Sequence, residues 1–196
     1  MQRTDEEMIE RPRVLLVPGS MRRHSTNLAA LRVAHDLGRE EGSTALFTGL
    51  SDLPLFSPDD DYEPLPDAVV ELRREIGLAD GILFSTPEYM ATLPGSFKNL
   101  LEWTVGGPEM DRKPVSWINV APKGRGEGAQ KTLRTVLGYL GARPTESAGR
   151  RVFVPRRSIG EDGRIEDGEV CAAVGDALLT FAAELSGAGR FTRAGL

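Results

Sequence analysis

An apolar stretch that ends at a proline–glycine pair and then passes into a helical pattern constrains this fold most strongly. Residues 13–17 are almost all apolar and are followed by Pro18 and Gly19, as is typical of a buried strand. From Asn27 onward, apolar residues recur at helical spacing, which predicts a helix over about residues 27–41. A strand that turns at glycine into a helix presents free backbone N–H groups, and the helix dipole adds partial positive charge. This stretch therefore suits an anion such as phosphate.

The polar side chains of the connecting loop add to this potential. Those with hydroxyl or amide groups are Ser20, Ser25, Thr26 and Asn27. Arg22 supplies a full positive charge on a planar group that matches the oxygens of a phosphate. An ordinary strand–helix turn, in which Ser25 or Thr26 caps the helix, would have the same composition. The loop by itself leaves both interpretations open.

The composition limits the class of protein. The chain has 196 residues, of which 40% are hydrophobic and 27% charged, and this fits one globular domain. Its net charge of −5 disfavours a nucleic-acid partner. No apolar run in the sequence approaches the roughly 20 residues of a membrane span, so no membrane partner is expected. One cysteine excludes an intrachain disulfide, and the first ten residues lack a signal-peptide core. We therefore expect a cytoplasmic protein.

Strand and helix patterns alternate along the rest of the chain. Further strands are expected near residues 44–48, 81–85, 115–121 and 143–155, the last with an interruption around Gly149. Further helices are expected near residues 65–78, 94–105, 127–140 and 167–185. Together these elements predict one domain over residues 13–186, between flexible tails at residues 1–12 and 187–196.

Five strand–helix units predict an α/β fold, a three-layer sandwich in which helices cover both faces of a five-stranded parallel sheet. For a chain of this size the flavodoxin-like strand order 2-1-3-4-5 is expected. In that order ligands bind at the carboxyl ends of the first and third strands, where the strand order reverses. A functional loop should therefore follow residues 81–85.

The loop after residues 81–85 does carry a second motif. Pro87 and Pro94 bracket it, so a helix can begin only at Pro94. A rigid loop of this kind can present its backbone groups to a flat ring with polar edges. Local packing of Tyr89 and Leu93 would explain the same residues without a ligand.

Together, the two loops resemble those of the NADPH-dependent FMN reductase family, which is flavodoxin-like and includes quinone, chromate and azo-dye reductases. The first loop has the pattern Gly19-Ser20-x-Arg22-x-x-Ser25-x-Asn27, and the second has Pro87-Glu88-Tyr89 followed by Pro94-Gly95-x-x-Lys98-Asn99 and Trp103. The likeness covers about residues 13–186. One departure is Met90, where the family usually has asparagine.

The resemblance implies that FMN is the cofactor. It implies a phosphate site at Ser20, Arg22, Ser25, Thr26 and Asn27, and a ring site at Pro87, Glu88, Tyr89 and Met90. NADPH or NADH would reduce the flavin, and a small acceptor would then take the electrons: a quinone, chromate, an azo dye, a ferric chelate or free flavin. The cofactor carries this chemistry, so no catalytic side chain is required.

The resemblance also implies a homodimer or homotetramer with the flavin near a subunit interface. The apolar residues that could form this interface are Leu53, Leu55, Phe56 and Trp103. Ordinary packing in the core is the alternative role for all of them.

The loop after the fourth expected strand offers a competing site. Gly124, Gly126 and Ala129 satisfy the Gly-x-Gly-x-x-Gly/Ala pattern of dinucleotide-binding loops, and Glu146 follows about 20 residues later. In a flavodoxin-like sheet the same loop would instead border the flavin ring, through Lys123 and Gly124. A glycine-rich connection without a ligand is the third interpretation.

Two other functions fit these motifs, and both are kept as alternatives. One is a non-enzymatic FMN-binding electron carrier; the other is a flavin-less interaction domain, which only Met90 favours. No metal site is expected, because His24 and His35 lack ligand partners at metal-binding spacing and the acidic residues 59–61 lack a calcium-loop pattern. Cys171 shares an apolar helical stripe and is expected in the core rather than as a nucleophile.

Overall fold

The structure is a computed structural model that describes residues 11–39 and 43–193. Its strands form one sheet in the order β2-β1-β3-β4-β5, with the short β6 paired to β4, and all paired strands are parallel. The strands are β1 (Val14–Pro18), β2 (Thr44–Leu46), β3 (Gly81–Ser85), β4 (Pro114–Asn119), β5 (Arg143–Pro144) and β6 (Arg150–Arg151). The predicted flavodoxin-like order 2-1-3-4-5 is therefore confirmed.

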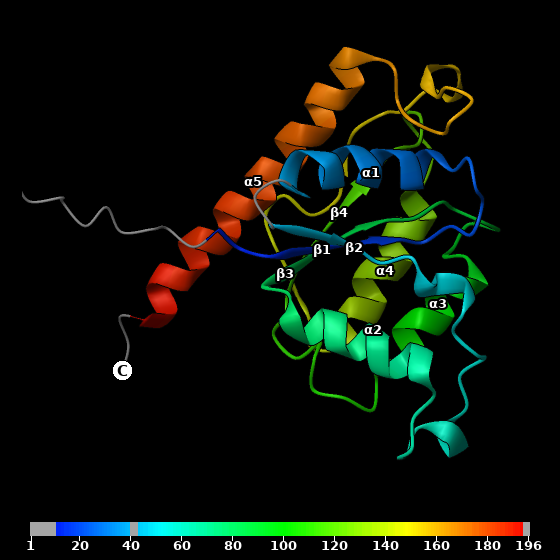
Figure 1. Cartoon of the computed structure of the whole chain (residues 1–196), viewed down its shortest axis with the longest axis vertical. Coiled ribbons are helices and arrows are strands. Elements are labelled where there is room, and N and C mark those ends of the chain that lie inside the picture. The colour runs from blue at the N-terminus through cyan, green and yellow to red at the C-terminus, as the bar shows by residue number, and fades with distance from the viewer. Residues whose placement is uncertain (1–10, 40–42, 194–196) are drawn as a thin grey trace, which may run out of the picture.

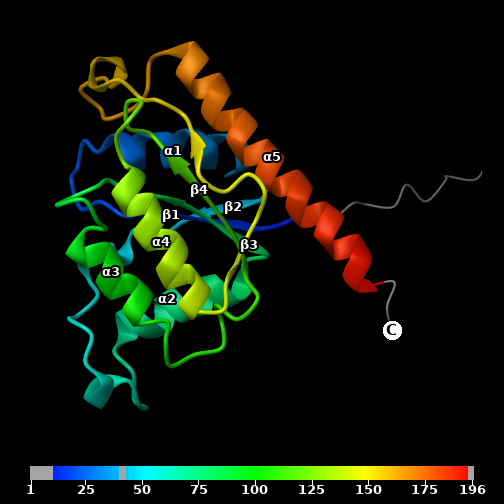
Figure 2. The same ribbon diagram turned by 180° about the vertical axis from the view of Figure 1, so that it is seen from behind.

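Helices cover both faces of this sheet. The α-helices are α1 (Thr26–Arg39), α2 (Asp67–Leu78), α3 (Gly95–Glu102), α4 (Glu127–Tyr139) and α5 (Gly168–Arg193), and short 3-10 helices span Gly49–Ser51, Pro58–Asp60 and Arg156–Ser158. Helices α1 and α5 lie on one face, and α2, α3 and α4 lie on the other (Figure 1). Figure 2 shows the same three layers from behind, with α4 beside α3. The predicted three-layer sandwich is confirmed.

Each face of the sheet has its own hydrophobic core. Strand β1 serves both: Leu15 packs with the cluster under α2, α3 and α4, whereas Leu16 packs with the cluster under α1 and α5. Phe97 on α3 and Phe181 on α5 are fully buried in the two clusters. Because helices cover both faces, every residue of β1 and β3 is buried, which explains their continuous apolar pattern.

The last predicted strand is divided, as its sequence indicates. Strands β5 and β6 pair with different parts of β4, and a turn separates them. In this turn Gly149 has a φ of 88° while its N–H donates to the carbonyl of Trp117 at 2.9 Å. A positive φ is inexpensive only for glycine, so the interruption around Gly149 has a backbone cause.

Helix α5 differs from the sequence expectation in two respects. It continues to Arg193, into the stretch expected to be a tail. Its segment Gly168–Gly187 is also long and apolar enough to cross a membrane, contrary to the expectation that no such run exists. Val174 and Phe181 of this segment are fully buried in the core shared with α1, so one face of the segment packs within the domain. Nearly all of the expected tail at residues 1–12 lies outside the described residues.

Candidate functional site

A cavity of about 460 Å³ opens at the carboxyl edge of the sheet. The loops that follow β1, β3, β4 and β6 form its walls. The residues of our predicted site that line it are Ser20, Arg22, Ser25, Thr26, Asn27, Pro87, Glu88 and Tyr89. Small-molecule sites have volumes of roughly 300–1,000 Å³, so the space suits a cofactor. The cavity lies where the strand order reverses, as predicted.

The loop after β1 ends in a capped helix whose first amides remain available. The Ser25 hydroxyl, which is buried, accepts a hydrogen bond from the N–H of Asn27 at 3.2 Å and so caps α1. Within the described residues, nothing accepts from the backbone N–H groups of His24, Ser25 or Thr26, although all three residues line the cavity. The capping interpretation of Ser25 is therefore confirmed, and it leaves unpaired donors for an anion.

The loops after β1 and β3 are held tightly together. Gly19 donates its N–H to the carbonyl of Ser85 at 2.8 Å. A Cβ atom at Gly19 would lie 2.4 Å from the hydroxyl of Thr86, so this close approach requires glycine. The buried Ser85 hydroxyl donates to Oδ1 of Asn27 at 2.9 Å. Asn27 therefore joins α1 to β3 with its side-chain oxygen, a contact that the sequence motif did not reveal.

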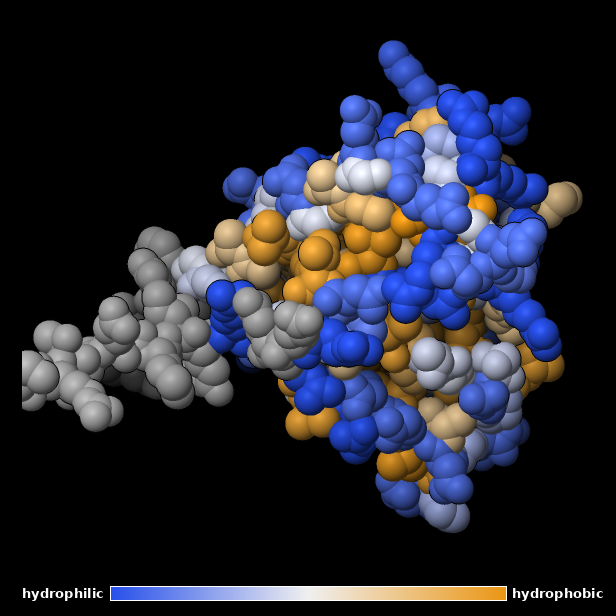
Figure 3. Space-filling model, turned by 45° about the horizontal axis from the view of Figure 1, so that its top comes forward, coloured by the Kyte–Doolittle hydropathy of each residue, from blue (hydrophilic) through white to orange (hydrophobic). Residues whose placement is uncertain are grey.

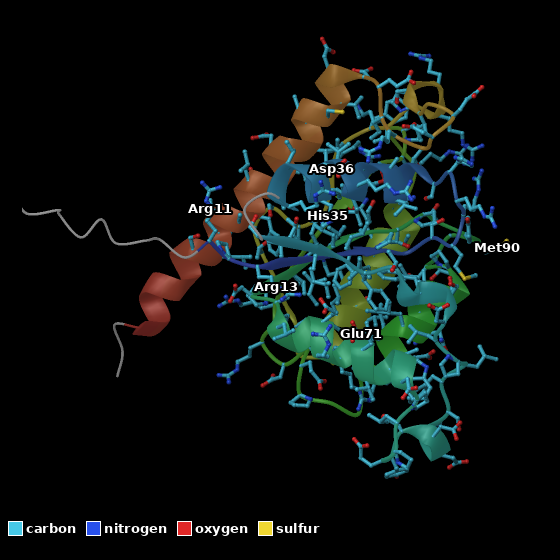
Figure 4. All side chains as sticks on the ribbon, in the orientation of Figure 1. Arg11, Arg13, His35, Asp36, Glu71 and Met90 are labelled. Atoms are coloured by element: carbon cyan, nitrogen blue, oxygen red, sulfur yellow. The ribbon has the colours of Figure 1, made fainter. Side chains whose placement is uncertain are left out.

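Met90 lies at the tip of a tight turn rather than in the cavity. Tyr89 and Thr92 exchange two backbone hydrogen bonds of 3.0 Å, and the residues between them, Met90 and Ala91, have φ values of 50° and 61°. Positive φ at both central residues is the geometry of a type I′ turn, which favours Asn-Gly. The Met90 side chain is 95% exposed and lies at the edge of the molecule (Figure 4). Asparagine, which the family usually has at this position, adopts such a positive φ more readily than methionine does.

Glu88 lines the cavity, and its carboxylate binds the first turn of α4. Its Oε2 atom accepts a hydrogen bond from the backbone N–H of Ala129 at 3.0 Å, in the first turn of α4. Further along, the hydroxyls of Thr92 and Thr132 lie 3.1 Å apart. The loop after β3 is therefore docked onto α4 at two positions.

The loop between β4 and α4 borders the cavity through residues that flank the predicted ones. Ala121, Pro122, Arg125 and Gly126 line the space, whereas Lys123 and Gly124 do not. Gly126 has a φ of 81°, and a Cβ atom there would lie 2.7 Å from the Asn119 side chain. The turn before α4 therefore requires glycine at position 126, whether or not a dinucleotide binds there.

Two side chains hold this loop in shape. The amide of Asn119 accepts from the N–H of Ala121 and donates to the carbonyl of Arg125, both at 3.0 Å. The Arg151 guanidinium donates to three carbonyls, those of Ala121 at 2.9 Å, Pro122 at 2.7 Å and Arg125 at 3.2 Å. The loop is therefore anchored through its carbonyl oxygens.

The structure adds cavity residues that the motifs did not identify. His24, Thr86 and Asn119 contribute to the lining, and so do Phe153 and Arg156 after β6. Proximity to the recognised loops could have suggested the first three. The last two follow the divided end of the sheet, where the sequence pattern is weakest.

Positive charge gathers around this cavity. Arg22, Arg125 and Arg156 line it, and no side-chain hydrogen bond or ion pair engages them in residues 11–39 and 43–193. Glu88 is the carboxylate of the lining, and it already binds an amide of α4. The electrostatic balance thus favours an anionic ligand.

Other candidate groups have structural partners. His35 Nδ1 lies 3.2 Å from the Thr44 hydroxyl, and Asp61 accepts from Arg73 at 2.6 Å. The described part of the chain holds no group of three or more His, Cys, Asp and Glu residues placed to bind a metal ion. Cys171 packs against the core under α1 and α5, as expected, and burial raises the pKa of its thiol, with a smaller contribution from Asp167. A raised pKa disfavours the reactive thiolate.

A second cavity, of about 470 Å³, lies between α1 and α5. Its lining is mainly apolar and includes Val14, Leu37, Leu178 and Leu179. Figure 3 shows the corresponding apolar surface over these two helices. This cavity lacks the concentration of hydrogen-bond donors found at the carboxyl edge of the sheet, so it is not the candidate site.

The apolar residues considered for a subunit interface have different roles. Trp103 is fully buried, its indole N–H donates to the carbonyl of Pro54 at 2.8 Å, and Phe56 packs edge-on against it at 5.1 Å. Leu53 also belongs to the core. Leu55 is 86% exposed. The core interpretation is therefore correct for Trp103 and Leu53, and Leu55 remains the interface candidate.

Comparison with known proteins gives the relationships of the chain. Residues 12–149 match the sequence profile of the NADPH-dependent FMN reductase family. An NAD(P)H-dependent FMN reductase of Pseudomonas aeruginosa is 31% identical over 158 residues, which cover 79% of this chain and 85% of the relative. A quinone reductase of Escherichia coli K12 is 31% identical over 140 residues, which cover 69% and 74% of the two chains.

A solved structure shares the fold of this chain. The flavoenzyme NAD(P)H:(acceptor) oxidoreductase FerB from Paracoccus denitrificans matches with a TM-score of 0.75 at 24% identity, over 89% of this chain and 97% of that one. This likeness supports the flavodoxin-like fold. The family match extends over most of the chain and includes both loops at the junction of β1 and β3. The chain therefore belongs to the NADPH-dependent FMN reductase family.

Proposed function

We propose that the cavity at the carboxyl edge of the sheet holds FMN, with the phosphate at the amino terminus of α1 and the ring between the loops after β3 and β4. The chain is an FMN-dependent NAD(P)H oxidoreductase by its family and relatives, and the proposal concerns how its residues perform that reaction. One observation carries the placement: His24, Ser25 and Thr26 line the cavity, and their backbone N–H groups have no acceptor within the described residues.

The proposed phosphate site combines several kinds of donor. The unpaired amides and the helix dipole attract the phosphate, and the hydroxyls of Ser20 and Thr26 can add hydrogen bonds. Arg22 adds full charge and a bidentate fork. Ser25 and Asn27 act indirectly, because their side chains already cap α1 and bind β3. They fix the direction in which the amides point.

The proposed ring site is formed mainly by backbone. Pro87, Glu88 and Tyr89 present one wall, and Pro122 and Gly126 present the other. FMN, when bound, supplies the capacity to accept hydride from a nicotinamide and to pass electrons on. The protein orients the ring between these walls and leaves the mouth open to the co-substrate and the acceptor in turn.

The acceptor is a small molecule, and we propose a quinone as its class. The half-exposed side chains of Tyr89 and Phe153 stand at the cavity and suit a flat, partly apolar ring. The relative from Escherichia coli is named a quinone reductase. Steady-state rates with benzoquinones, chromate, an azo dye, a ferric chelate and free FMN test this choice. A preference for a non-quinone acceptor would contradict it.

We also propose a cytoplasmic homodimer or homotetramer. Leu55 and Tyr62 lie on the same long loop and are both strongly exposed, which supports a buried role in an assembly. Sedimentation analysis of the protein and of Leu55→Asp checks this. A monomeric protein, or an assembly unaffected by the substitution, would contradict an interface at Leu55.

A visible spectrum followed by rapid mixing tests the reductase proposal as a whole. The protein as purified, or after addition of FMN, is expected to show bound oxidised flavin, and anaerobic NADPH or NADH should bleach it within a catalytic turnover. An electron carrier would bind FMN but would not be reduced directly by a nicotinamide. A flavin-less interaction domain would not bind FMN at all. Riboflavin, which lacks the phosphate, should bind more weakly than FMN.

A further inference from the structure

The Glu88 side chain links the two walls of the cavity. Glu88 follows Pro87 on the wall formed by the loop after β3, and its Oε2 accepts from the Ala129 N–H at 3.0 Å. Ala129 lies in the first turn of α4, whose preceding loop forms the opposite wall. A carboxylate at a helix amino terminus satisfies an amide that has no partner within the helix, and it interacts favourably with the dipole.

The backbone of the same loop, at Ala91, also makes close contact with α4. A Cβ atom at Gly128 would lie 2.2 Å from the carbonyl oxygen of Ala91 and 2.9 Å from Oε2 of Glu88. A backbone atom cannot move away as the end of a flexible side chain can, so this approach requires glycine at position 128. The contact between the loop after β3 and α4 thus rests on Glu88 and on Gly128 together.

We propose that Glu88 is a positioning residue for the flavin ring: its carboxylate binds the amino terminus of α4 and thereby fixes the spacing between the two walls. The proposal depends on the proposed function, because it assumes that the ring lies between these walls. Glu88 is not a catalytic residue in this account, since its carboxylate holds the protein and not the flavin. Gly128 permits the contact and is not among the residues that line the cavity.

Substitutions at the two positions separate positioning from direct contact with the flavin. Glu88→Ala removes the acceptor, and Gly128→Ala pushes the Ala91 carbonyl and the Glu88 carboxylate away from α4. Both substitutions are expected to raise the Kd for flavin about tenfold, which corresponds to the loss of one charge-assisted hydrogen bond. The loss should be equal for FMN and riboflavin, because the ring wall changes and the phosphate site does not. Glu88→Gln, which keeps an acceptor oxygen, should stay within about threefold of the native protein.

The matched control is Glu127→Ala. Glu127 lies in the same first turn of α4, but its side chain is 72% exposed and its carboxylate lies 3.9 Å from the Arg151 guanidinium. Its loss changes the charge at the helix terminus without changing the spacing of the walls, so FMN affinity should be preserved. Circular dichroism of each variant separates a local change from loss of the fold.

Amide hydrogen exchange at Ala129 provides a readout that needs no flavin. In the apoprotein the Ala129 N–H should exchange at least tenfold faster in Glu88→Ala than in the native protein, and Glu88→Gln should restore most of the protection. Unchanged exchange in Glu88→Ala would overturn the proposal, as would native affinity in Gly128→Ala or equal losses in Glu88→Gln and Glu88→Ala. A native protein that protects Ala129 yet binds no flavin would instead refute the proposed function.

Discussion

Two helices, α1 and α4, begin at the rim of the same cavity, and each follows a loop that leaves a buried strand of the sheet. At the start of α1, the N–H groups of His24, Ser25 and Thr26 have no acceptor in the described residues. At the start of α4, a carboxylate of the chain itself, that of Glu88, already binds the Ala129 N–H. Two termini with the same intrinsic dipole therefore differ in what they can still bind.

This difference shows why a glycine-rich loop before a helix is an incomplete sign of a phosphate site. A phosphate at α4 would meet the negative charge of Glu88, and like charges in close contact are unfavourable. A phosphate at α1 would meet unpaired amides, hydroxyls and Arg22. Each helix has one first-turn amide bonded to a side chain, but only α4 has carboxylates at its amino terminus, those of Glu88 and Glu127. The helix without a carboxylate at its amino terminus, α1, is therefore the one that retains affinity for an external anion.

The largest expected effect comes from giving α1 a carboxylate of its own. Ser20 is buried at the cavity, and Ser20→Asp would place a negative charge where the phosphate is proposed to lie. We expect this variant to lose bound FMN completely, as measured by the ratio of flavin to protein absorbance. Ser20→Ala is the control, because it removes one hydroxyl without adding charge and should keep most of the flavin.

Removing the positive charge at α1 should have the next largest effect. Arg22→Ala is expected to weaken FMN binding by about 1.5–3 kcal/mol, the range for a hydrogen bond to a charged group. Riboflavin should bind equally well before and after the change, because it carries no phosphate. Titration of the apoprotein with both flavins measures this. Unchanged FMN affinity would mean that Arg22 faces solvent and that the phosphate lies elsewhere.

A change in the loop before α4 should act on turnover rather than on phosphate binding. Gly124 has a φ of 77°, and apart from its two chain neighbours no atom of the described residues lies within 4 Å of the position that a Cβ would occupy. Gly124→Val is therefore strained by its backbone conformation rather than by crowding. Because the loop borders the cavity, we expect slower NADPH oxidation with flavin occupancy preserved. If this variant lost flavin while Ser20→Asp kept it, the phosphate would belong to α4.

The sequence was sufficient for the features that depend on local pattern. Continuous apolar strands and alternating helices predicted the parallel sheet and its strand order, and the motifs after β1 and β3 predicted most of the lining that these two loops contribute. These features follow from periodicity, from glycine and proline, and from the reversal of strand order. Each of them involves residues close together in the chain or an established rule of topology.

The features that the sequence could not supply depend on contacts between distant residues. Glu88 meets Ala129 across 41 positions of the chain, and no local pattern indicates that its carboxylate faces α4. Hydrogen bonds from Asn119 and Arg151 fix the conformation of the loop after β4. In this conformation Pro122 and Arg125 border the cavity, whereas Lys123 and Gly124 do not. Arg156 was missed because it follows a strand too short to show a periodic pattern.

The smallest effect is expected from a change in the turn of residues 89–92, which belongs to the loop docked on α4 and not to the proposed phosphate site at α1. Met90 has a φ of 50° in a type I′ turn and an almost fully exposed side chain. Asparagine tolerates this backbone conformation better than methionine does. Met90→Asn should therefore stabilise the protein by about 0.5–1 kcal/mol, seen as a small rise in Tm. FMN affinity and the acceptor profile should stay unchanged, because the side chain does not line the cavity. A shift in the flavin midpoint potential without a rise in Tm would instead place the Met90 side chain at the ring.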